Sequence, residues 1–358
     1  MNDLEKARQI ISSVDVEMAA LFEKRMQAAE LVAAYKKEHG LKIFDAVREA
    51  ALLERNAGLI QNEAYRSYYV SFQQHTMDLS KSYQRRLMEG MRIAYSGVKG
   101  AFAELAAGKV FPQAEALGYA DFAAAYKAVE NDECDVAILP IENSYNGDVG
   151  QVMDLAYFGS LHINGIYELE VTQNLLVKPG TRLEDITEVI SHPQALGQCA
   201  DYISQHGWKE TPAVNTAVAA HTVAGSERKD LAAIGSVEAG ELYGLVKLEG
   251  HIETSGGNTT RFAVFSRSAK AAAPGDNHFV MTFTVGHRAG ALGKAVSVIG
   301  EHGFNLEALK SRPTKNQNWD YYFFVEGEGN LHTEAGRNML AALSECCSSV
   351  KLLGSFEV

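Results

Sequence analysis

The chain has little positive charge, no long apolar segment and no basic leader. Lys and Arg number 33 against 45 Asp and Glu, so the net charge of the 358 residues is −12. General nucleic-acid binders carry basic patches, and this balance argues against that class. No apolar run approaches the roughly 18 residues of a membrane span. The acidic start, residues 1–5, lacks the pattern of a signal peptide. We therefore expect a cytoplasmic protein with neither a nucleic-acid nor a membrane partner.

Cysteine is also scarce, and the motifs of common cofactor sites are missing. None of the four cysteines (Cys134, Cys199, Cys346, Cys347) forms a Cys-x-x-Cys pair, which favours reduced core thiols. A metal needs three or four closely spaced ligands, and His192 with Cys199 does not supply them. The turn at residues 96–100 lacks the glycine pattern of a nucleotide loop. We expect no metal and no organic cofactor.

Proline is absent from the first 90 residues, where apolar residues recur at helical spacing. The pattern predicts helices over residues 3–37, 46–62 and 63–88, with Gly40 after the first. The first helix would be about 50 Å long at about 1.5 Å per residue. A helix of that length cannot bury its apolar stripe alone. We therefore expect an intertwined helical dimer.

Charged and polar residues mark these helices at regular positions. Arg25 and Lys36 are eleven residues apart and share a helix face. Arg8 lies about 25 Å from Arg25 along the helix, so it would serve the site of a partner chain. Asp45, Arg48 and Glu49 cluster at the second helix start, and Ser80 and Gln84 are one turn apart on the third. Any one of them alone is typical of a solvated face.

As a set, these eight residues resemble the active-site pattern of the all-helical chorismate mutases, with a one-residue gap before Ser80. The resemblance implies that Arg25 and Arg8 of the partner subunit hold the two carboxylates of chorismate. Lys36 and Gln84 would bind the ether oxygen, Glu49 the hydroxyl, and Arg48 would support substrate binding, while Asp45 and Ser80 complete the pattern. A Claisen rearrangement needs no nucleophile, only a compact substrate conformer and stabilised charge on the ether oxygen.

From residue 91 to about 270, short strands alternate with helices, which favours α/β lobes with largely parallel sheets. Polar residues follow several strand ends, where such sheets bind ligands. The run Gly256-Gly257-Asn258-Thr259-Thr260-Arg261-Phe262 combines backbone freedom with four polar side chains before an apolar strand. By itself this run also fits a solvated turn.

Seven stretches in this region together resemble prephenate dehydratase. They begin at Gly97, Pro140, Ser191, Asn215, Ala233, Glu241 and Thr260. The resemblance implies two lobes built like a periplasmic binding protein, with the active site between them and Thr260 as the key threonine. The other pocket candidates are Glu142, Asn143, Ser144, His192, Gln194, Asn215, Thr216, Arg261 and Phe262. One departure is Ala103, where the family often has a hydroxyl residue.

After a linker at residues 271–276, the pattern strand-helix-strand-strand-helix-strand predicts a ferredoxin-like domain. It resembles the ACT domain, a module that senses amino acids. The matching positions imply a phenylalanine site at Asn277, His278, Gly290, Ala291, Leu292, Ser311, Arg312 and Pro313. Lys310 stands where the family usually has Glu. The alternative is a dimerisation module without a ligand.

The whole chain thus resembles the bifunctional chorismate mutase–prephenate dehydratases, with domains at 1–90, 91–270 and 275–358. The resemblance implies conversion of chorismate to prephenate and then phenylpyruvate, feedback inhibition by L-phenylalanine, and a homodimer or larger homo-oligomer. Three alternatives remain: a dehydratase that uses arogenate, a solute-binding sensor without catalysis, and a scaffold whose helices only dimerise.

Overall fold

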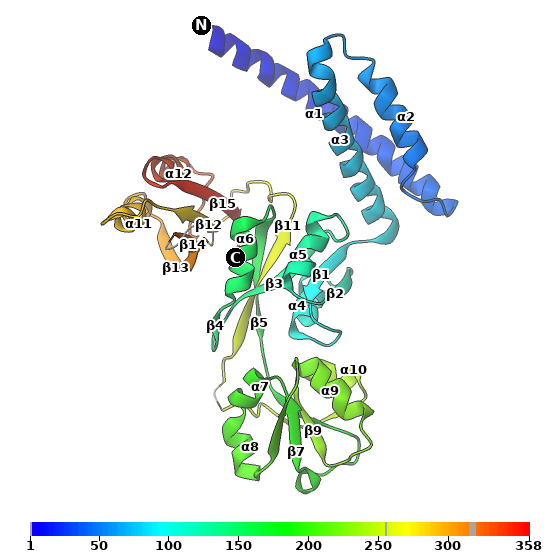
Figure 1. Ribbon diagram of the computed structural model, residues 1–358, viewed down its shortest axis with the longest axis vertical. Helices are drawn as coiled ribbons and strands as arrows, with labels where there is room; N and C mark the ends of the chain where they lie inside the picture. The colour runs from blue at the N-terminus through cyan, green and yellow to red at the C-terminus, as the bar shows by residue number, and fades with distance from the viewer. Residues whose placement is uncertain (1, 255, 315–319) are drawn as a thin grey trace. The chain divides into compact units, whose positions relative to one another are not determined.

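The computed structural model describes residues 2–254, 256–314 and 320–358. The chain divides into two compact units between Met91 and Arg92. Each unit is described by itself below, and Figure 1 gives the course of the chain within each.

The first unit consists of the helices α1 (Asp3–Glu38), α2 (Ala46–Ala57) and α3 (Glu63–Glu89). The Asn2 side chain and Glu5 form a capping box at the start of α1. The predicted second helix was too long, because it ends at Ala57 rather than at residue 62. Gly58 follows, and glycine disfavours helix continuation. The Asn62 side chain then accepts from the backbone N–H of Ala64 and starts α3.

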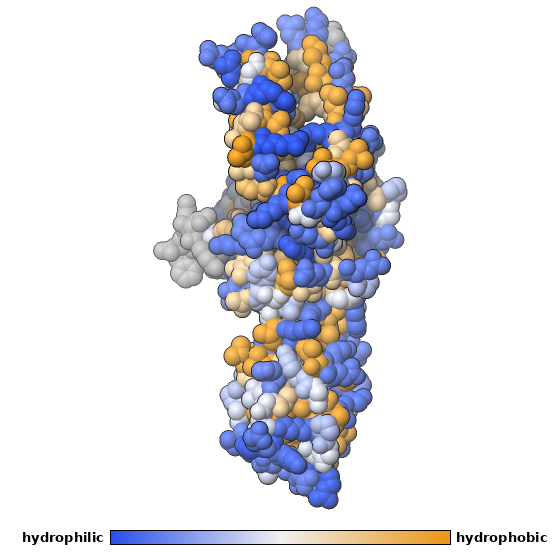
Figure 2. Space-filling model, turned by 90° about the vertical axis from the view of Figure 1, so that its right-hand side faces the viewer, coloured by the Kyte–Doolittle hydropathy of each residue, from blue (hydrophilic) through white to orange (hydrophobic). Residues whose placement is uncertain are grey.

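Helix α1 is only partly covered by its own unit. Its buried residues, Ala29 and Ala33, lie in its C-terminal half. The apolar stripe of the N-terminal half is exposed, from Leu4 to Phe22. On the face that Figure 2 shows, apolar side chains also lie on the surface of the helical unit, at the top of the view. No helix in the described residues is long and apolar enough to cross a membrane.

The second unit begins with two α/β lobes. The sheet of the first lobe has the strand order β2-β1-β3-β11-β5, with the short β4 paired to β3. Its strands are β1 (Arg92–Ser96), β2 (Glu115–Tyr119), β3 (Val136–Asn143), β4 (Gly147–Asp148), β5 (His162–Glu170) and β11 (Thr259–Ser266). Its helices are α4 (Phe102–Val110), α5 (Phe122–Glu130) and α6 (Gly150–Phe158).

The second lobe is built on a sheet of order β10-β6-β9-β7-β8. Its strands are β6 (Asn174–Val177), β7 (Glu188–Ser191), β8 (Lys209–Pro212), β9 (Leu231–Gly235) and β10 (Val246–Gly250). Its helices are the 3₁₀ turn η1 (Leu183–Asp185), α7 (Pro193–Gln198), α8 (Ala200–His206), α9 (Thr216–Gly225) and α10 (Val237–Leu242). The chain enters this lobe after β5 and returns to the first through β11 (Figure 1).

The two-lobe fold is confirmed, but the expectation of largely parallel sheets was wrong. Strand β11 is antiparallel to both β3 and β5, and β6 is antiparallel to both β9 and β10. Strands β6 and β11 each follow a segment in which the chain passes from one lobe to the other. They are antiparallel to their neighbours because the chain leaves the first lobe and later returns to it. Strands β2, β5, β8 and β10 mix exposed polar residues with apolar ones, so the sequence carries only a weak strand pattern there.

The C-terminal domain has the predicted order: β12 (His278–Thr284), α11 (Ala291–Glu301), β13 (Asn305–Pro313), β14 (Tyr321–Glu328), α12 (Glu334–Cys346) and β15 (Ser349–Phe356). Its antiparallel sheet runs β13-β14-β12-β15. Both helices share one core with this sheet. Side chains such as Tyr322 and Phe356 pack instead into the core of the first lobe, beside Phe265. The domain is therefore fixed against the first lobe by a common apolar core.

Candidate active sites

A cavity of about 280 Å³ lies in the second unit and is lined by residues of both lobes. Thr260, Asn143 and Phe262 line it from strands β11 and β3 of the first lobe. His192, Gln194, Asn215 and Thr216 line it from the second. Its volume is near the lower limit for sites that bind small ligands. Seven of the residues predicted for the dehydratase site thus meet around one cavity.

Thr260 lies opposite Asn143 in the pairing of β11 with β3. The Asn143 side-chain amide donates to Thr260 Oγ1 at 2.9 Å and to Asn258 Oδ1 at 2.7 Å. Asn143 Oδ1 in turn accepts from the backbone N–H groups of Tyr145 and Asn146. Asn143 is therefore held in one orientation, with its N–H group aimed at the threonine hydroxyl.

Side-chain amides continue this contact from the first lobe to the second. Asn258 Nδ2 and Gln173 Nε2 both donate to Gln198 Oε1, each at 3.1 Å. Two further amide atoms of this chain, Gln198 Nε2 and Gln173 Oε1, are buried and have no hydrogen-bond partner among the described residues. Buried polar atoms normally have a partner, so these two are available to a ligand in the cavity.

Helices α4 and α9 begin at the cavity wall. Ala101, Phe102 and Ala103 form the start of α4, and Asn215 and Thr216 form the start of α9. The Asn215 side chain caps α9 by accepting from the Val218 N–H at 2.7 Å. The first turn of a helix has unpaired N–H groups and a partial positive charge, which together suit a carboxylate.

Formal charge is missing from the wall of this cavity. Its lining, within the described residues, contains no Lys, Arg, Asp or Glu. His192 is its one histidine, and burial lowers the pKa of the imidazole, which favours the neutral ring. His192 Nδ1 accepts from the Gln194 N–H at the start of α7. The wall therefore offers dipoles and hydrogen bonds to a ligand.

Three residues predicted for this site do not line the cavity. Ser144 holds the loop before β11, because its hydroxyl donates to the Gly257 carbonyl and accepts from the Thr259 N–H. Glu142 and Arg261 pair with each other at 3.2 Å and with residues of the C-terminal domain. The charges of Glu142 and Arg261 are therefore paired with each other and with the C-terminal domain, and neither residue is among those that line the cavity.

The first unit brings part of the predicted mutase set together. Arg25 of α1 donates to the Thr76 carbonyl at 3.0 Å and to the Ser80 hydroxyl, both on α3. Gln84 is buried one turn beyond Ser80, and its Oε1 has no hydrogen-bond partner in the described part of the chain. Burial lowers the pKa of the Arg25 guanidinium, which still remains charged.

The other predicted mutase residues do not take part in this contact. Lys36 Nζ donates to the Ile43 carbonyl at 2.6 Å, and Asp45 caps α2 by accepting from the Arg48 N–H. Glu49 pairs with Lys81 of α3 at 2.9 Å. Arg8 and Arg48 have exposed side chains. A single copy of the unit therefore brings Arg25 into contact with Ser80, one turn before the buried Gln84, and leaves Arg8 exposed.

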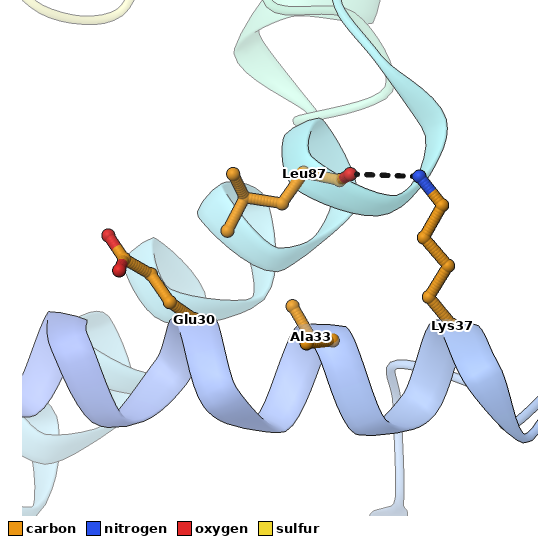
Figure 3. Close-up of a pocket in the computed structure, with 5 residues that line it drawn as sticks. Glu30, Ala33, Lys37 and Leu87 are labelled. Atoms are coloured by element: carbon orange, nitrogen blue, oxygen red, sulfur yellow. Dashed lines mark hydrogen bonds between the residues drawn. The ribbon is translucent and has the colours of Figure 1, made fainter.

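A second cavity, of about 290 Å³, lies between α1 and α3 and is lined by Glu30, Ala33, Ala34, Lys37 and Leu87. Figure 3 shows Lys37 reaching from α1 to the Leu87 carbonyl of α3. None of the predicted mutase residues lines this cavity, so we do not assign the mutase reaction to it.

The predicted phenylalanine residues fall at three places in the C-terminal domain. His278 is buried beside Glu307 and Glu326, and Asn277 next to it is exposed. Gly290 precedes α11 with a φ of 79°, a conformation that suits glycine, and Ala291 and Leu292 begin that helix. Ser311 and Pro313 are exposed on β13, whereas Arg312 pairs with Asp154 of the first lobe at 2.7 Å.

The residue patterns missed Gln173, Gln198 and Asn258 as parts of the dehydratase site. Two signals were present: Asn258 lies in the polar run before Thr260, and Gln198 follows Gln194 by one helical turn. The residues around Gln173 contain no pattern that marks a site. Gln173 lies at the cavity because the chain passes from the first lobe to the second between β5 and β6.

Comparison with known proteins agrees with this division of the chain. Residues 7–85 match the family described as chorismate mutase type II, and residues 93–270 match prephenate dehydratase. A "bifunctional chorismate mutase/prephenate dehydratase" of Enterobacter agglomerans is 33% identical over 99% of this chain and 96% of its own length.

Two further relatives match the second unit. An "arogenate dehydratase/prephenate dehydratase 2, chloroplastic" of Arabidopsis thaliana is 35% identical over 75% of this chain and 73% of its own. The structure of a prephenate dehydratase of Arthrobacter aurescens in complex with L-Phe matches with a TM-score of 0.69 and 27% identity, covering 75% of this chain and 90% of that one. With both enzyme domains matched and a relative that aligns over nearly its full length, the chain belongs to the family of bifunctional chorismate mutase–prephenate dehydratases.

Proposed function

We propose that the two activities of this enzyme occur at separate sites. Chorismate would rearrange to prephenate among the helices of the first unit, and prephenate would become phenylpyruvate in the cavity lined by Thr260. The observation that carries the second assignment is the hydrogen bond from Asn143 to Thr260 Oγ1 at the cavity wall.

In the dehydratase site, Thr260 would assist the departure of the ring hydroxyl. Its Oγ1 accepts from Asn143, which leaves the threonine proton free to donate to the leaving oxygen. That donation stabilises the negative charge that develops as the C–O bond breaks. Loss of the hydroxyl and of CO₂ makes the ring aromatic, so the site has to orient the substrate and needs no nucleophile.

The two carboxylates of prephenate would be held by neutral donors. The starts of α4 and α9 present backbone N–H groups at the cavity, and Gln198 Nε2 is an unpaired buried donor beside them. Placing the carboxylate that leaves as CO₂ away from a formal cation also avoids stabilising the charged ground state.

Arogenate is the second candidate substrate, because it differs from prephenate by an ammonium group in place of the keto oxygen. An ammonium normally pairs with a carboxylate when it is buried. The described lining contains neither Asp nor Glu, which favours prephenate. The ratio of kcat/KM for the two substrates measures this preference.

In the mutase site, Arg25 would bind one carboxylate of chorismate, and Lys36 with Gln84 would stabilise the ether oxygen. An ether oxygen only accepts, so the Nε2 group of Gln84 would donate to it, while the buried Oε1, which has no partner among the described residues, would accept from a donor of the substrate. Lys36 would exchange the Ile43 carbonyl, which it contacts at 2.6 Å, for the ether oxygen of the substrate.

A second copy of the chain would complete this site. Arg8 lies about 25 Å from Arg25 along α1, and the apolar stripe around it is exposed. Pairing of two such stripes would bury them and bring Arg8 of the partner subunit to the site. The enzyme would then be a homodimer or a larger homo-oligomer.

A pair of variants tests both assignments, each serving as the control of the other. We expect Thr260→Ala to lower dehydratase turnover at least about 100-fold and Lys36→Ala to lower mutase turnover by a similar factor, the usual effect of losing an electrostatic stabiliser. Each variant should keep the other activity. The two rates, measured on the same preparations, check this. A fall of both rates in one variant would indicate misfolding, and normal dehydratase turnover in Thr260→Ala would disprove the role of Thr260.

The C-terminal domain would bind L-phenylalanine and inhibit the dehydratase reaction. The structure of the Arthrobacter relative in complex with L-Phe supports this, as does the left-handed Gly290, which leaves room for a ligand beside the backbone. Dehydratase turnover measured across a phenylalanine titration should fall, while mutase turnover serves as the control. An unchanged dehydratase rate would make this domain a dimerisation module.

The division into domains at 1–90, 91–270 and 275–358 is part of this proposal, and the two matched families support its first two parts. A cytoplasmic location stays a prediction, which cell fractionation tests.

A further inference from the structure

Two residue pairs lie back to back on strands β3 and β11. Thr260 is opposite Asn143, and Arg261 is opposite Glu142. Successive side chains of a strand point to opposite faces of its sheet, so the two pairs project in opposite directions. Thr260 and Asn143 line the cavity. Arg261 and Glu142 reach the C-terminal domain on the other face.

Four charged residues connect the two strands to that domain. Arg261 pairs with Glu142 at 3.2 Å and with Glu326 of β14 at 2.8 Å. Lys310 of β13 pairs with the same Glu142 at 3.2 Å and with Asp148 at 2.8 Å. We call Lys310, Glu142, Arg261 and Glu326 the ion-pair quartet. Its two outer members belong to the C-terminal domain and its two inner members to the strands of the site.

Glu326 and Arg261 are the members of the quartet that are best shielded from water. Glu326 is only 2% exposed and the Arg261 side chain 22%. Burial raises the pKa of the Glu326 carboxyl, but His278 and Arg261 outweigh that effect and hold the pKa below its usual value. An ion pair in such surroundings is costly to break, because one charge is then left without a partner.

The positive charge of Lys310 decides the sign of this contact. A carboxylate at this position would face Glu142 and Asp148, the two present partners of Lys310. Three carboxylates at such short range repel one another. The lysine therefore turns a contact that would separate the domain from the strands into one that holds them together.

We propose that Glu142 and Arg261 are positioning residues of the dehydratase reaction, which the C-terminal domain holds in place through Lys310 and Glu326. The quartet fixes the backbone of β3 and β11 directly behind Asn143 and Thr260, and so sets the distance between that amide and that hydroxyl. If ligand binding moved β13 or β14, the ion pairs would pass the displacement to Glu142 and Arg261, which are next to Asn143 and Thr260 in the chain. This inference rests on the proposed role of Thr260.

The test uses the full chain and two variants at opposite ends of the quartet, Glu326→Gln and Lys310→Met. In both we expect the dehydratase kcat to fall about tenfold with KM changed less than about twofold, within the range of mutations that alter coupling between sites. Lys310→Arg, which keeps the cation, should restore kcat. Lys310 is partly exposed, so its variants remain informative even where the buried Glu326→Gln fails to fold.

Lys351→Met is the matched control. Lys351 is also a cation of the C-terminal domain that contacts the first lobe, but it donates to the carbonyls of Ala156, Tyr157 and Gly159 at the end of α6. Its loss should leave the dehydratase kcat unchanged. An equal fall in Lys351→Met and Lys310→Met, or an unchanged kcat in Lys310→Met, would overturn the inference. Either result leaves wild-type turnover and the effect of Thr260→Ala untouched, so the proposed function is judged separately.

Discussion

At the scale of single residues, the dehydratase site depends on one amide. Asn143 donates to Thr260 and to Asn258 while its oxygen is held by two backbone N–H groups. Asn143 and Thr260 were both candidates before any contact was known, because the stretches that contain them resemble prephenate dehydratase. The sequence did not show that the two side chains touch.

Removal of the Asn143 amide tests this contact. We expect Asn143→Ala to lower dehydratase kcat about 100-fold, similar to the loss of one donor in other electrostatic sites, because the Thr260 hydroxyl loses its orientation. Ser144→Ala is the matched control, since Ser144 contacts the same loop without lining the cavity. Steady-state kinetics of both variants check this, and equal losses would contradict it.

At the scale of elements, helix starts have both a structural and a functional task. Asn215 caps α9 at the cavity, and Thr333 caps α12 in the C-terminal domain by accepting from the Gly336 N–H. Both caps were within reach of sequence analysis, because Asn and Thr before an apolar helix are common capping residues. Only the structure distinguishes the cap at the cavity from the cap elsewhere.

Substitution of each capping residue by alanine gives a matched pair of variants. Asn215→Ala and Thr333→Ala should each cost about 1 kcal/mol of stability, the usual effect of losing an N-cap. Only Asn215→Ala should also raise the dehydratase KM, because the start of α9 would no longer be ordered for a carboxylate. Thermal unfolding and KM values, measured together, check this. A rise of KM in Thr333→Ala would show that loss of stability alone explains the effect.

At the scale of the whole molecule, the first unit cannot complete its proposed site by itself. Arg25 contacts Ser80 between α1 and α3, and Gln84 is buried one turn beyond Ser80, whereas Arg8 is exposed farther along α1. The apolar stripe from Leu4 to Phe22 is exposed as well. The length and the composition of this helix predicted both facts, because a stripe without a cover requires a partner.

Mixing of two inactive variants tests the shared site. Arg8→Ala and Arg25→Ala should each abolish mutase turnover, but a mixed dimer contains one site with both arginines intact. After joint refolding of equal amounts we expect about a quarter of wild-type mutase turnover, because statistically half of the dimers are mixed and each has one working site. Mutase assays before and after mixing check this. No recovery would place both arginines of a site in one chain.

The sequence by itself determined the order of the three regions, the helical nature of the first and the βαββαβ order of the last. These features depend on hydrophobic periodicity, caps and turn residues, which act over a few positions. Its resemblance to prephenate dehydratase also singled out Thr260 before any contact was known.

Only the tertiary structure decided which distant residues meet. Asn143 and Thr260 are 117 positions apart, and the partners of Arg261 in β3 and β14 come from opposite sides of it in the sequence. Strand direction was misjudged for the same reason, since periodicity is identical in parallel and antiparallel strands. Long-range pairing is set by how the lobes and the C-terminal domain share their cores, and no local pattern records it.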